Sequence, residues 1–243
     1  MRQALELSLD QPQPDQSRLD WLWTLIEPQI NVRLERRVER RIRESRLPER
    51  KTFAGFNWDF QPDLDRDLVL ELATLRFLAE GKNVLLGGES GTGKSHIAKA
   101  LALIACKDNR RVRYTTSAEL LADLNASLAD NTLEDRLKAY VRPDVLVIDE
   151  FGLEQVERKM ATRSGLMQKV IFPRYNERRS TLITSNIPWE AWADYLDDQF
   201  GATAILDRLL HQSHVISIQG PSYRDWEHKQ EVAARHAARK VRT

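Results

Sequence analysis

Apolar positions in the first part of the chain recur at helical spacing. From Arg18 onward they fall at Trp21, Leu22, Leu25 and Ile26, and then every four residues at Ile30, Leu34, Val38 and Ile42. A repeat of about four residues is typical of one face of an α-helix. We therefore expect a small helical region, in which Pro28 breaks or kinks the helix and Pro48 follows its end.

An aromatic cluster without helical periodicity follows, at Phe53, Phe56, Trp58 and Phe60. We expect this linker to dock onto the main domain. Residues 63–80 then carry leucines on one side, which predicts a helix from Asp63 to Glu80.

From Asn83 the chain alternates between short β-branched runs and longer helical segments. The runs are Val84–Leu86, Val112–Tyr114, Val145–Ile148, Leu182–Thr184 and Val215–Ile218. The helical segments are Ser95–Lys107, Ala118–Ser127, Leu133–Tyr140, Ala161–Asn176 and, in pieces, Trp189–Leu210. Repeated β-α-β units predict an α/β fold of three layers, in which helices cover both faces of a parallel sheet.

Length and composition add limits to this picture. A chain of 243 residues can hold one sizeable core and an appendage. Since it has no apolar run of about 18 residues and no apolar leader, we expect neither a membrane span nor a secretion signal. A single cysteine, Cys106, excludes a disulfide within the chain and fits a cytoplasmic protein.

One motif predicts a phosphate site. Residues 88–95 match the pattern G-x-x-x-x-G-K-[ST] completely, between a predicted strand and a predicted helix. Glycines let backbone N–H groups converge on phosphates, and the helix N-terminus adds partial positive charge. We expect ATP here, with Lys94 at the β- and γ-phosphates and the Ser95 hydroxyl on Mg²⁺. The nucleotide-binding residues are then Gly88, Glu89, Ser90, Gly91, Thr92, Gly93, Lys94, Ser95 and His96.

Glu89 and His96 differ in character from the rest of this segment. Glu89 would repel phosphate if it pointed inward, so we expect its side chain to face solvent. His96 is expected to pack within the helix rather than to act as a ligand.

An apolar strand that ends in two acids, residues 144–150, predicts the hydrolysis machinery. Asp149 should hold the magnesium, directly or through water, and Glu150 should polarise the attacking water. The alternative is a buried strand capped by solvated acids. An adjacent Asp-Glu pair suits activation of water, so a kinase is disfavoured.

Asn186 ends the next strand-like run, Ser180–Asn186. If this strand lies between those of the phosphate loop and Asp149, Asn186 would lie near the γ-phosphate and orient the water, the role called sensor 1. Alone, an Asn before Ile-Pro is more typical of a turn or a helix cap.

Arg208 lies where an arginine finger would reach the ATP of a neighbouring subunit. Such a finger accelerates hydrolysis by about 10³–10⁵ where it has been measured. The alternative is a solvated or salt-bridged arginine, paired with Asp207. Arg174 and Arg178 are weaker candidates for the finger.

Taken in order, these motifs resemble the IstB-like ATP-binding proteins, the transposition helpers of bacterial insertion sequences. They resemble nearly as closely the DnaC and DnaI type of helicase loader; both are branches of the AAA+ ATPases. The resemblance covers about residues 53–224. It rests on Gly93–His96, Val145–Glu150, Arg174–Tyr175, Ser180–Asn186, Asp207–Leu209 and Gly220–Arg224.

The resemblance implies a P-loop AAA+ domain over residues 53–219, without a separate C-terminal lid. A flexible N-terminus (1–16), a helical assembly or partner region (17–52) and a basic tail (220–243) would flank it. It also implies an ATP-dependent homo-oligomer on DNA, with ATP at subunit interfaces, that recruits a transposase or, in the loader branch, grips a helicase. Arg224 would be a sensor 2-like contact.

The arginines of residues 33–46 leave two interpretations open. They could contact the phosphates of double-stranded DNA without reading its sequence. Alternatively, they belong to a solvated helix laced with Glu-Arg pairs, since acidic residues share the segment. A third class of function, a nucleotide-gated scaffold with negligible hydrolysis, also stays open.

Overall fold

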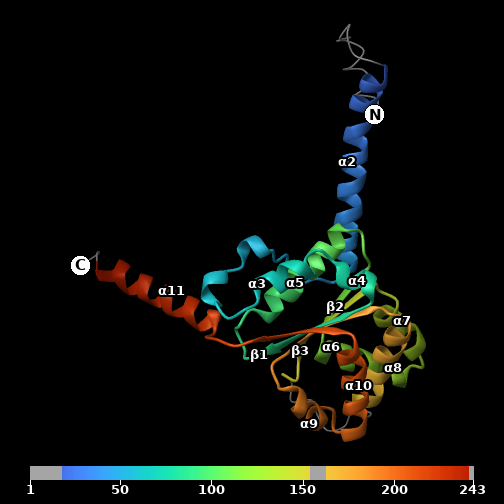
Figure 1. Ribbon diagram of the computed structural model, residues 1–243, viewed down its shortest axis with the longest axis vertical. Coiled ribbons are helices and arrows are strands. Elements are labelled where there is room, and N and C mark those ends of the chain that lie inside the picture. The colour runs from blue at the N-terminus through green and yellow to red at the C-terminus, as the bar shows by residue number, and fades with distance from the viewer. Residues whose placement is uncertain (1–17, 154–162, 241–243) are drawn as a thin grey trace.

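The computed structural model describes residues 18–153 and 163–240 (Figure 1). The predicted flexible segment 1–16 and the predicted helix start at Ala161 lie outside these residues.

A sheet of five parallel strands forms the centre of the molecule, in the order β2-β3-β4-β1-β5. The strands are β1 (Asn83–Gly88), β2 (Val112–Thr116), β3 (Val145–Phe151), β4 (Ser180–Ser185) and β5 (Ser213–Ile218). Each coincides with one of the five predicted runs. The order places β4 between β1 and β3, the arrangement that a role for Asn186 at the phosphate site requires.

Helices cover both faces of the sheet (Figure 1). On one face lie α3 (Arg66–Leu72), α4 (Arg76–Glu80) and α5 (Lys94–Lys107). The other face carries α6 (Ser117–Ala129), α7 (Leu133–Val141), α8 (Arg163–Asn176), α9 (Trp192–Leu196) and α10 (Gln199–His211). Successive strand residues serve opposite layers, since Leu86 belongs to the first apolar cluster and Leu85 to the second.

The single helix predicted for residues 63–80 is wrong, because two short helices occupy this segment. Asp65 caps α3 by accepting a hydrogen bond from the Leu68 N–H at 2.9 Å. Leu75 then adopts the left-handed conformation, with φ 60°, and separates α3 from α4. The apolar spacing gave no sign of this break, because Leu68, Leu72, Leu75 and Leu78 keep the three- and four-residue spacing of a single helix across it.

Of the two outcomes expected at Pro28, a break or a kink of the helix, the break is wrong, because α2 (Arg18–Glu44) continues through this residue. A proline removes one backbone donor, which costs a helix stability without always ending it. Most of α2 projects away from the body (Figure 1). Near its end Ile42 is buried against the main core, whereas Trp23 is 58% exposed.

The Glu-Arg pairs expected around α2 are present. Arg40 and Arg41 pair with Glu44 at 3.9 and 3.6 Å, and Arg50 pairs with Glu39. These pairs support the solvated-helix interpretation for this part of the segment.

The aromatic linker docks onto the main domain, as predicted. It forms two short 3₁₀ turns, η1 (Phe53–Gly55) and η2 (Trp58–Phe60). Phe56 is buried, with its ring 4.8 Å from Trp58 and 5.2 Å from His96. At the other end of the domain, η3 (Trp189–Ala191) precedes α9, and α11 (Tyr223–Lys240) follows β5.

No helix among residues 18–153 and 163–240 is both long and apolar enough to cross a membrane.

Candidate nucleotide-binding site

The loop between β1 and α5 has a conformation that glycine makes possible. Gly88 and Gly91 have φ angles of 143° and 84°, in the region that favours glycine. A Cβ on Gly88 would lie 2.1 Å from the Ile218 carbonyl oxygen, and one on Gly91 would lie 2.1 Å from the Ser222 hydroxyl oxygen. The loop is therefore packed closely against the end of β5 and the segment that follows it.

Lys94 lies at the first position of α5 and folds back over the loop. Its ammonium group donates hydrogen bonds to the carbonyl oxygens of Gly88 and Glu89, at 2.7 and 2.6 Å. Burial lowers the pKa of Lys94 to about 8, although the charge of Asp149 opposes this shift. The Glu89 side chain is exposed, as predicted.

Asp149, at the end of β3, is 1% exposed and accepts several hydrogen bonds. Its Oδ1 accepts from the Ser95 hydroxyl at 2.8 Å and from the Thr184 hydroxyl. Its Oδ2 accepts from the Tyr114 hydroxyl. Burial and the nearby Asp149 charge raise the pKa of Tyr114, so this hydroxyl stays protonated and is the donor.

Glu150 follows in a left-handed conformation, with φ 61°. The pairing of β3 with β4 shifts register here, between Ile148 and Phe151. The Glu150 N–H donates to the Thr184 hydroxyl oxygen at 2.9 Å, which ties the irregular residue to β4. An irregularity of this kind re-aims a side chain at a strand end, and Glu150 lines the cavity described next.

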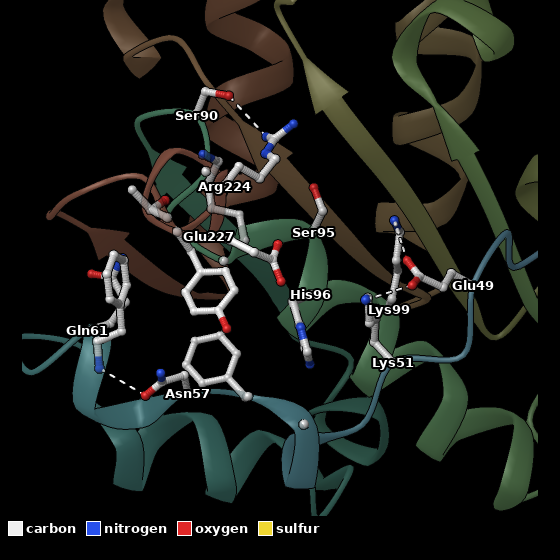
Figure 2. Close-up of a pocket in the computed structure, with 18 of the residues that line it drawn as sticks. Glu49, Lys51, Asn57, Gln61, Ser90, Ser95, His96, Lys99, Arg224 and Glu227 are labelled. Atoms are coloured by element: carbon white, nitrogen blue, oxygen red, sulfur yellow. Dashed lines mark hydrogen bonds and ion pairs between the residues drawn. The ribbon is translucent and has the colours of Figure 1, made fainter. Parts of the chain in front are cut away.

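A cavity of about 460 Å³ collects most of the predicted site residues. Its phosphate end, defined as the walls made by the loop and strand ends, includes Ser90 to His96, Glu150 and Asn186. The opposite walls come from the linker and from α11, and Figure 2 shows Gln61, Asn57, Arg224 and Glu227 around the space. Because the phosphate loop and Lys94 form one wall, the cavity can hold a ligand with a phosphate group.

The start of α11 is anchored on the phosphate loop. The Tyr223 N–H donates to the Gly91 carbonyl oxygen at 3.0 Å, and Arg224 donates to the Ser90 hydroxyl oxygen at 3.1 Å (Figure 2). Gln61 of the linker donates to the Pro221 carbonyl oxygen at 3.1 Å. Arg224 is thus brought to the loop, as its proposed sensor 2-like role requires.

His96 packs as predicted, since its ring contacts Phe56 and its Nε2 lies 2.8 Å from the Thr52 carbonyl oxygen. It nevertheless lies in the cavity wall.

Four predicted site residues do not line this cavity: Gly88, Glu89, Asp149 and Arg208. Asp149 reaches it through its contact with Ser95, whereas Arg208 lies apart. Its guanidinium carbon lies 3.8 Å above the Phe172 ring, and its Nη1 donates to the Ala204 carbonyl oxygen at 2.8 Å. A finger acts on a neighbouring subunit, so this position leaves the prediction untested.

Arg174 is excluded as a finger because its side chain is completely buried. It donates to the Thr181 hydroxyl oxygen and to backbone carbonyl oxygens, which belong to Tyr140, Val141, Pro143 and Ser180. These bonds join α7, α8 and β4, so the role of Arg174 is structural.

Sequence reasoning missed Tyr114 and Thr184 as members of the site. Both look like ordinary strand residues, and only the sheet order shows that they flank Asp149. Apart from Arg224, the linker and α11 residues of the cavity wall were missed for a similar reason. The unusual density of aromatic residues at 53–60 was a usable signal.

Ser95, at the phosphate end, and Asp149 together fit a magnesium ion. The Ser95 hydroxyl and the Asp149 carboxylate are both oxygen ligands and lie in contact. Within the described ranges, no group of three or more His, Cys, Asp or Glu side chains could hold a metal alone. Mg²⁺ at phosphate sites needs no such group, because one or two carboxylates, phosphates and waters complete its shell.

Comparison with known proteins agrees with this geometry. The model of a family described as IstB-like ATP binding protein matches residues 1–231. An ATP-binding protein of insertion sequence IS21 from Pseudomonas aeruginosa is 38% identical over 205 residues, which cover 84% of this chain and 76% of that protein. One of insertion sequence IS232 from Bacillus thuringiensis subsp. berliner is 34% identical over 212 residues, which cover 87% and 83%.

Solved structures give the fold. The crystal structure of DnaI superposes with a TM-score of 0.56 at 24% identity, over 71% of this chain and 90% of that one. AMPPCP-bound DnaA from Aquifex aeolicus gives a TM-score of 0.58 at 18% identity, over 71% and 51%. These likenesses confirm the predicted α/β fold of the P-loop AAA+ type. The family model spans nearly the whole chain, and relatives are 34–38% identical to it: this chain belongs to the IstB-like ATP-binding protein family.

Proposed function

We propose that this chain binds ATP together with Mg²⁺ and hydrolyses the nucleotide. The observation that carries the proposal is the 2.8 Å contact of the buried Asp149 carboxylate with the Ser95 hydroxyl, because Ser95 lines one cavity together with Lys94 and Glu150. A loop that merely turned between a strand and a helix would need neither the buried acid nor the buried lysine. Water-activating chemistry requires both, since the lysine binds phosphate and the acid binds the metal.

Each residue has a role in this reaction. Backbone N–H groups of the loop and the Lys94 ammonium hold the β- and γ-phosphates, and Lys94 leaves its loop carbonyls to do so. Ser95 and Asp149 hold Mg²⁺, which when bound neutralises charge that develops on the phosphates. Glu150 takes a proton from the attacking water, while Asn186 orients that water and Arg224 contacts phosphate from α11. Arg208 acts on the nucleotide of the neighbouring subunit.

At the level of the cell, we propose an ATP-dependent homo-oligomer on double-stranded DNA that recruits or stimulates a transposase. The relatives at 34–38% identity belong to insertion sequences, which supports this setting. The projecting helix α2 supports assembly or partner contacts by residues 17–52. A helicase loader is favoured only by likeness of fold, to DnaI and to DnaC at 23–24% identity.

Glu150→Gln tests the hydrolytic proposal. Removing the base should lower ATP turnover by about 10²–10⁴-fold, because general-base catalysis typically contributes that factor. ATP affinity, measured with a fluorescent analogue, should stay within about twofold, because glutamine keeps the shape of the glutamate side chain. Glu49→Gln is the matched control, since Glu49 also lines the cavity but pairs with Lys51 at 2.7 Å. Undiminished turnover in Glu150→Gln would refute the assignment, and no turnover in any variant would favour a nucleotide-gated scaffold.

The proposed partners need separate measurements. Binding to duplex DNA should be independent of sequence and should weaken steeply as salt rises, because phosphate contacts release counterions. The purified chain should retain the transposase of an adjacent reading frame in the presence of ATP. Retention of a replicative helicase instead would establish the loader.

A further inference from the structure

Tyr114 contacts two distant parts of the molecule at once. Its hydroxyl donates to Asp149 Oδ2 in the site, while its backbone N–H donates to the Ser45 carbonyl oxygen at 2.7 Å. Ser45 is fully buried and is the first residue after α2. One residue therefore joins the base of the projecting helix to the acid proposed to hold the metal.

The Asp149 carboxylate is held differently at its two oxygens. Oδ1 faces Ser95, Thr184 and the Glu150 N–H, the last at 3.2 Å. Among described residues, the Tyr114 hydroxyl is the side-chain donor to Oδ2. Without it, the carboxylate would keep one buried oxygen unsatisfied and could rotate about its own bond. Tyr114 thus holds the plane of the carboxylate in the orientation in which one oxygen faces Ser95.

The backbone contact of Tyr114 follows from its place at the sheet edge. Because β2 has a neighbouring strand on one side only, an N–H on its outer side needs another acceptor. The turn after α2 supplies it. This turn, which we call the seat of α2 (Ile42, Ser45 and Leu47), is shaped by Ser45 Oγ, which donates to the Ile42 carbonyl oxygen at 2.7 Å and accepts from the Leu47 N–H at 3.2 Å.

We propose that Tyr114 is a positioning residue that orients Asp149 for the metal and ties that orientation to the seat of α2. This inference rests on the proposed function, because it assumes that Asp149 serves a magnesium-bound nucleotide. Through Tyr114, a partner that binds α2 could alter the orientation of Asp149 in the nucleotide site. Tyr114 itself touches neither phosphate nor metal.

Tyr114→Phe tests the positioning role because it removes the hydroxyl and keeps the ring. The Mg²⁺ concentration for half-maximal binding of a fluorescent ATP analogue should rise about tenfold, the loss typical when a partner of a ligating group is removed. Affinity for the same analogue in EDTA should not change. Tyr140→Phe is the matched control: Tyr140 is 1% exposed and donates to Asp123 at 2.7 Å, away from the site. It should leave the Mg²⁺ dependence unaltered.

The outcomes separate the inference from the proposed function. An unchanged Mg²⁺ dependence in Tyr114→Phe would overturn the positioning role, and so would an equal loss of affinity with and without metal. Absence of Mg²⁺-dependent binding in the wild-type chain would instead overturn the proposed function.

A double-mutant cycle tests the link to α2. Ile42→Ala, which loosens the seat, should raise the half-saturating Mg²⁺ concentration about threefold in the wild-type background, a coupling of common size. It should add nothing in the Tyr114→Phe background. Leu34→Ala, on the exposed part of α2 at 47% exposure, is the control and should have no effect. Additive shifts from Ile42→Ala and Tyr114→Phe would overturn the link.

Discussion

Asp149, near the end of β3, is 1% exposed and accepts hydrogen bonds from Ser95, Thr184 and Tyr114. Glu44, at the end of α2, has a side chain that is 55% exposed and meets its arginines at 3.6 and 3.9 Å. A buried charge is costly unless it is fully bonded, whereas an exposed ion pair contributes about 0–1 kcal/mol. A carboxylate is therefore tightly constrained at Asp149 in the sheet and only loosely held at Glu44 on α2. Four predictions test this difference, from the largest expected effect to the smallest.

Arg174→Leu should have the largest effect on stability. The substitution leaves buried carbonyl oxygens of α7 and β4 without their donor, and each such group costs about 1–3 kcal/mol. We expect the free energy of unfolding to fall by about 3 kcal/mol or more in urea denaturation. Arg208→Leu is the control, since Arg208 is only half-buried, and should lose less than about 1 kcal/mol. Equal losses would show that burial does not make Arg174 contribute more than Arg208 to the free energy of unfolding.

Lys94→Ala should abolish most nucleotide binding. Two charge-assisted hydrogen bonds to phosphate, at about 1.5–3 kcal/mol each, correspond to a loss of about 100-fold or more in affinity. Lys99→Ala provides the comparison, because Lys99 also lines the cavity but has only a 3.9 Å pair with Glu49. Isothermal titration with ATP and Mg²⁺ would measure both. An equal loss of affinity in Lys99→Ala would contradict the assignment of the phosphates to the loop that contains Lys94.

The lowered pKa of Lys94, about 8, predicts how ATP affinity depends on pH. Below about pH 7 the Lys94 ammonium is already charged, so its protonation should not make ATP affinity depend on pH. Above pH 8 the ligand-free protein loses this proton, while phosphate favours the charged form. Binding must then take up a proton, and affinity should fall by up to about tenfold per pH unit. Binding heats in buffers of different ionisation enthalpy should give near-zero uptake at pH 6.5 and uptake towards one proton at pH 8.5. Zero uptake at both pH values would contradict the shift.

Glu44→Gln should have the smallest effect. Its exposed pairs with Arg40 and Arg41 are screened by water and salt, so we expect a change below about 0.5 kcal/mol in the free energy of unfolding. A thermal melt at two salt concentrations would measure it. A loss above about 1.5 kcal/mol would mean that the Glu44 ion pairs stabilise the fold as a buried charge does, which would contradict the difference between Glu44 and Asp149.

The sequence predicted the features that depend on local pattern. The phosphate loop, the strand that ends at Asp149 and the five strand positions all follow from short motifs and from β-branched runs. The break at Leu75 could not be predicted, because a left-handed residue with an apolar side chain looks like any other helical leucine. The roles of Tyr114 and Thr184 depend on which strands are neighbours, and the contact of α11 with Gly91 joins segments over 130 residues apart. Tertiary arrangement alone determines such contacts.

A crystal soaked with a non-hydrolysable ATP analogue and Mg²⁺ tests the central claim most directly. We predict a triphosphate against the N–H groups of residues 91–95, Lys94 turned from the Gly88 carbonyl towards phosphate, and a metal between Ser95 and Asp149. Nucleotide bound elsewhere, or a Ser95–Asp149 hydrogen bond that persists with no metal beside it, would contradict the account.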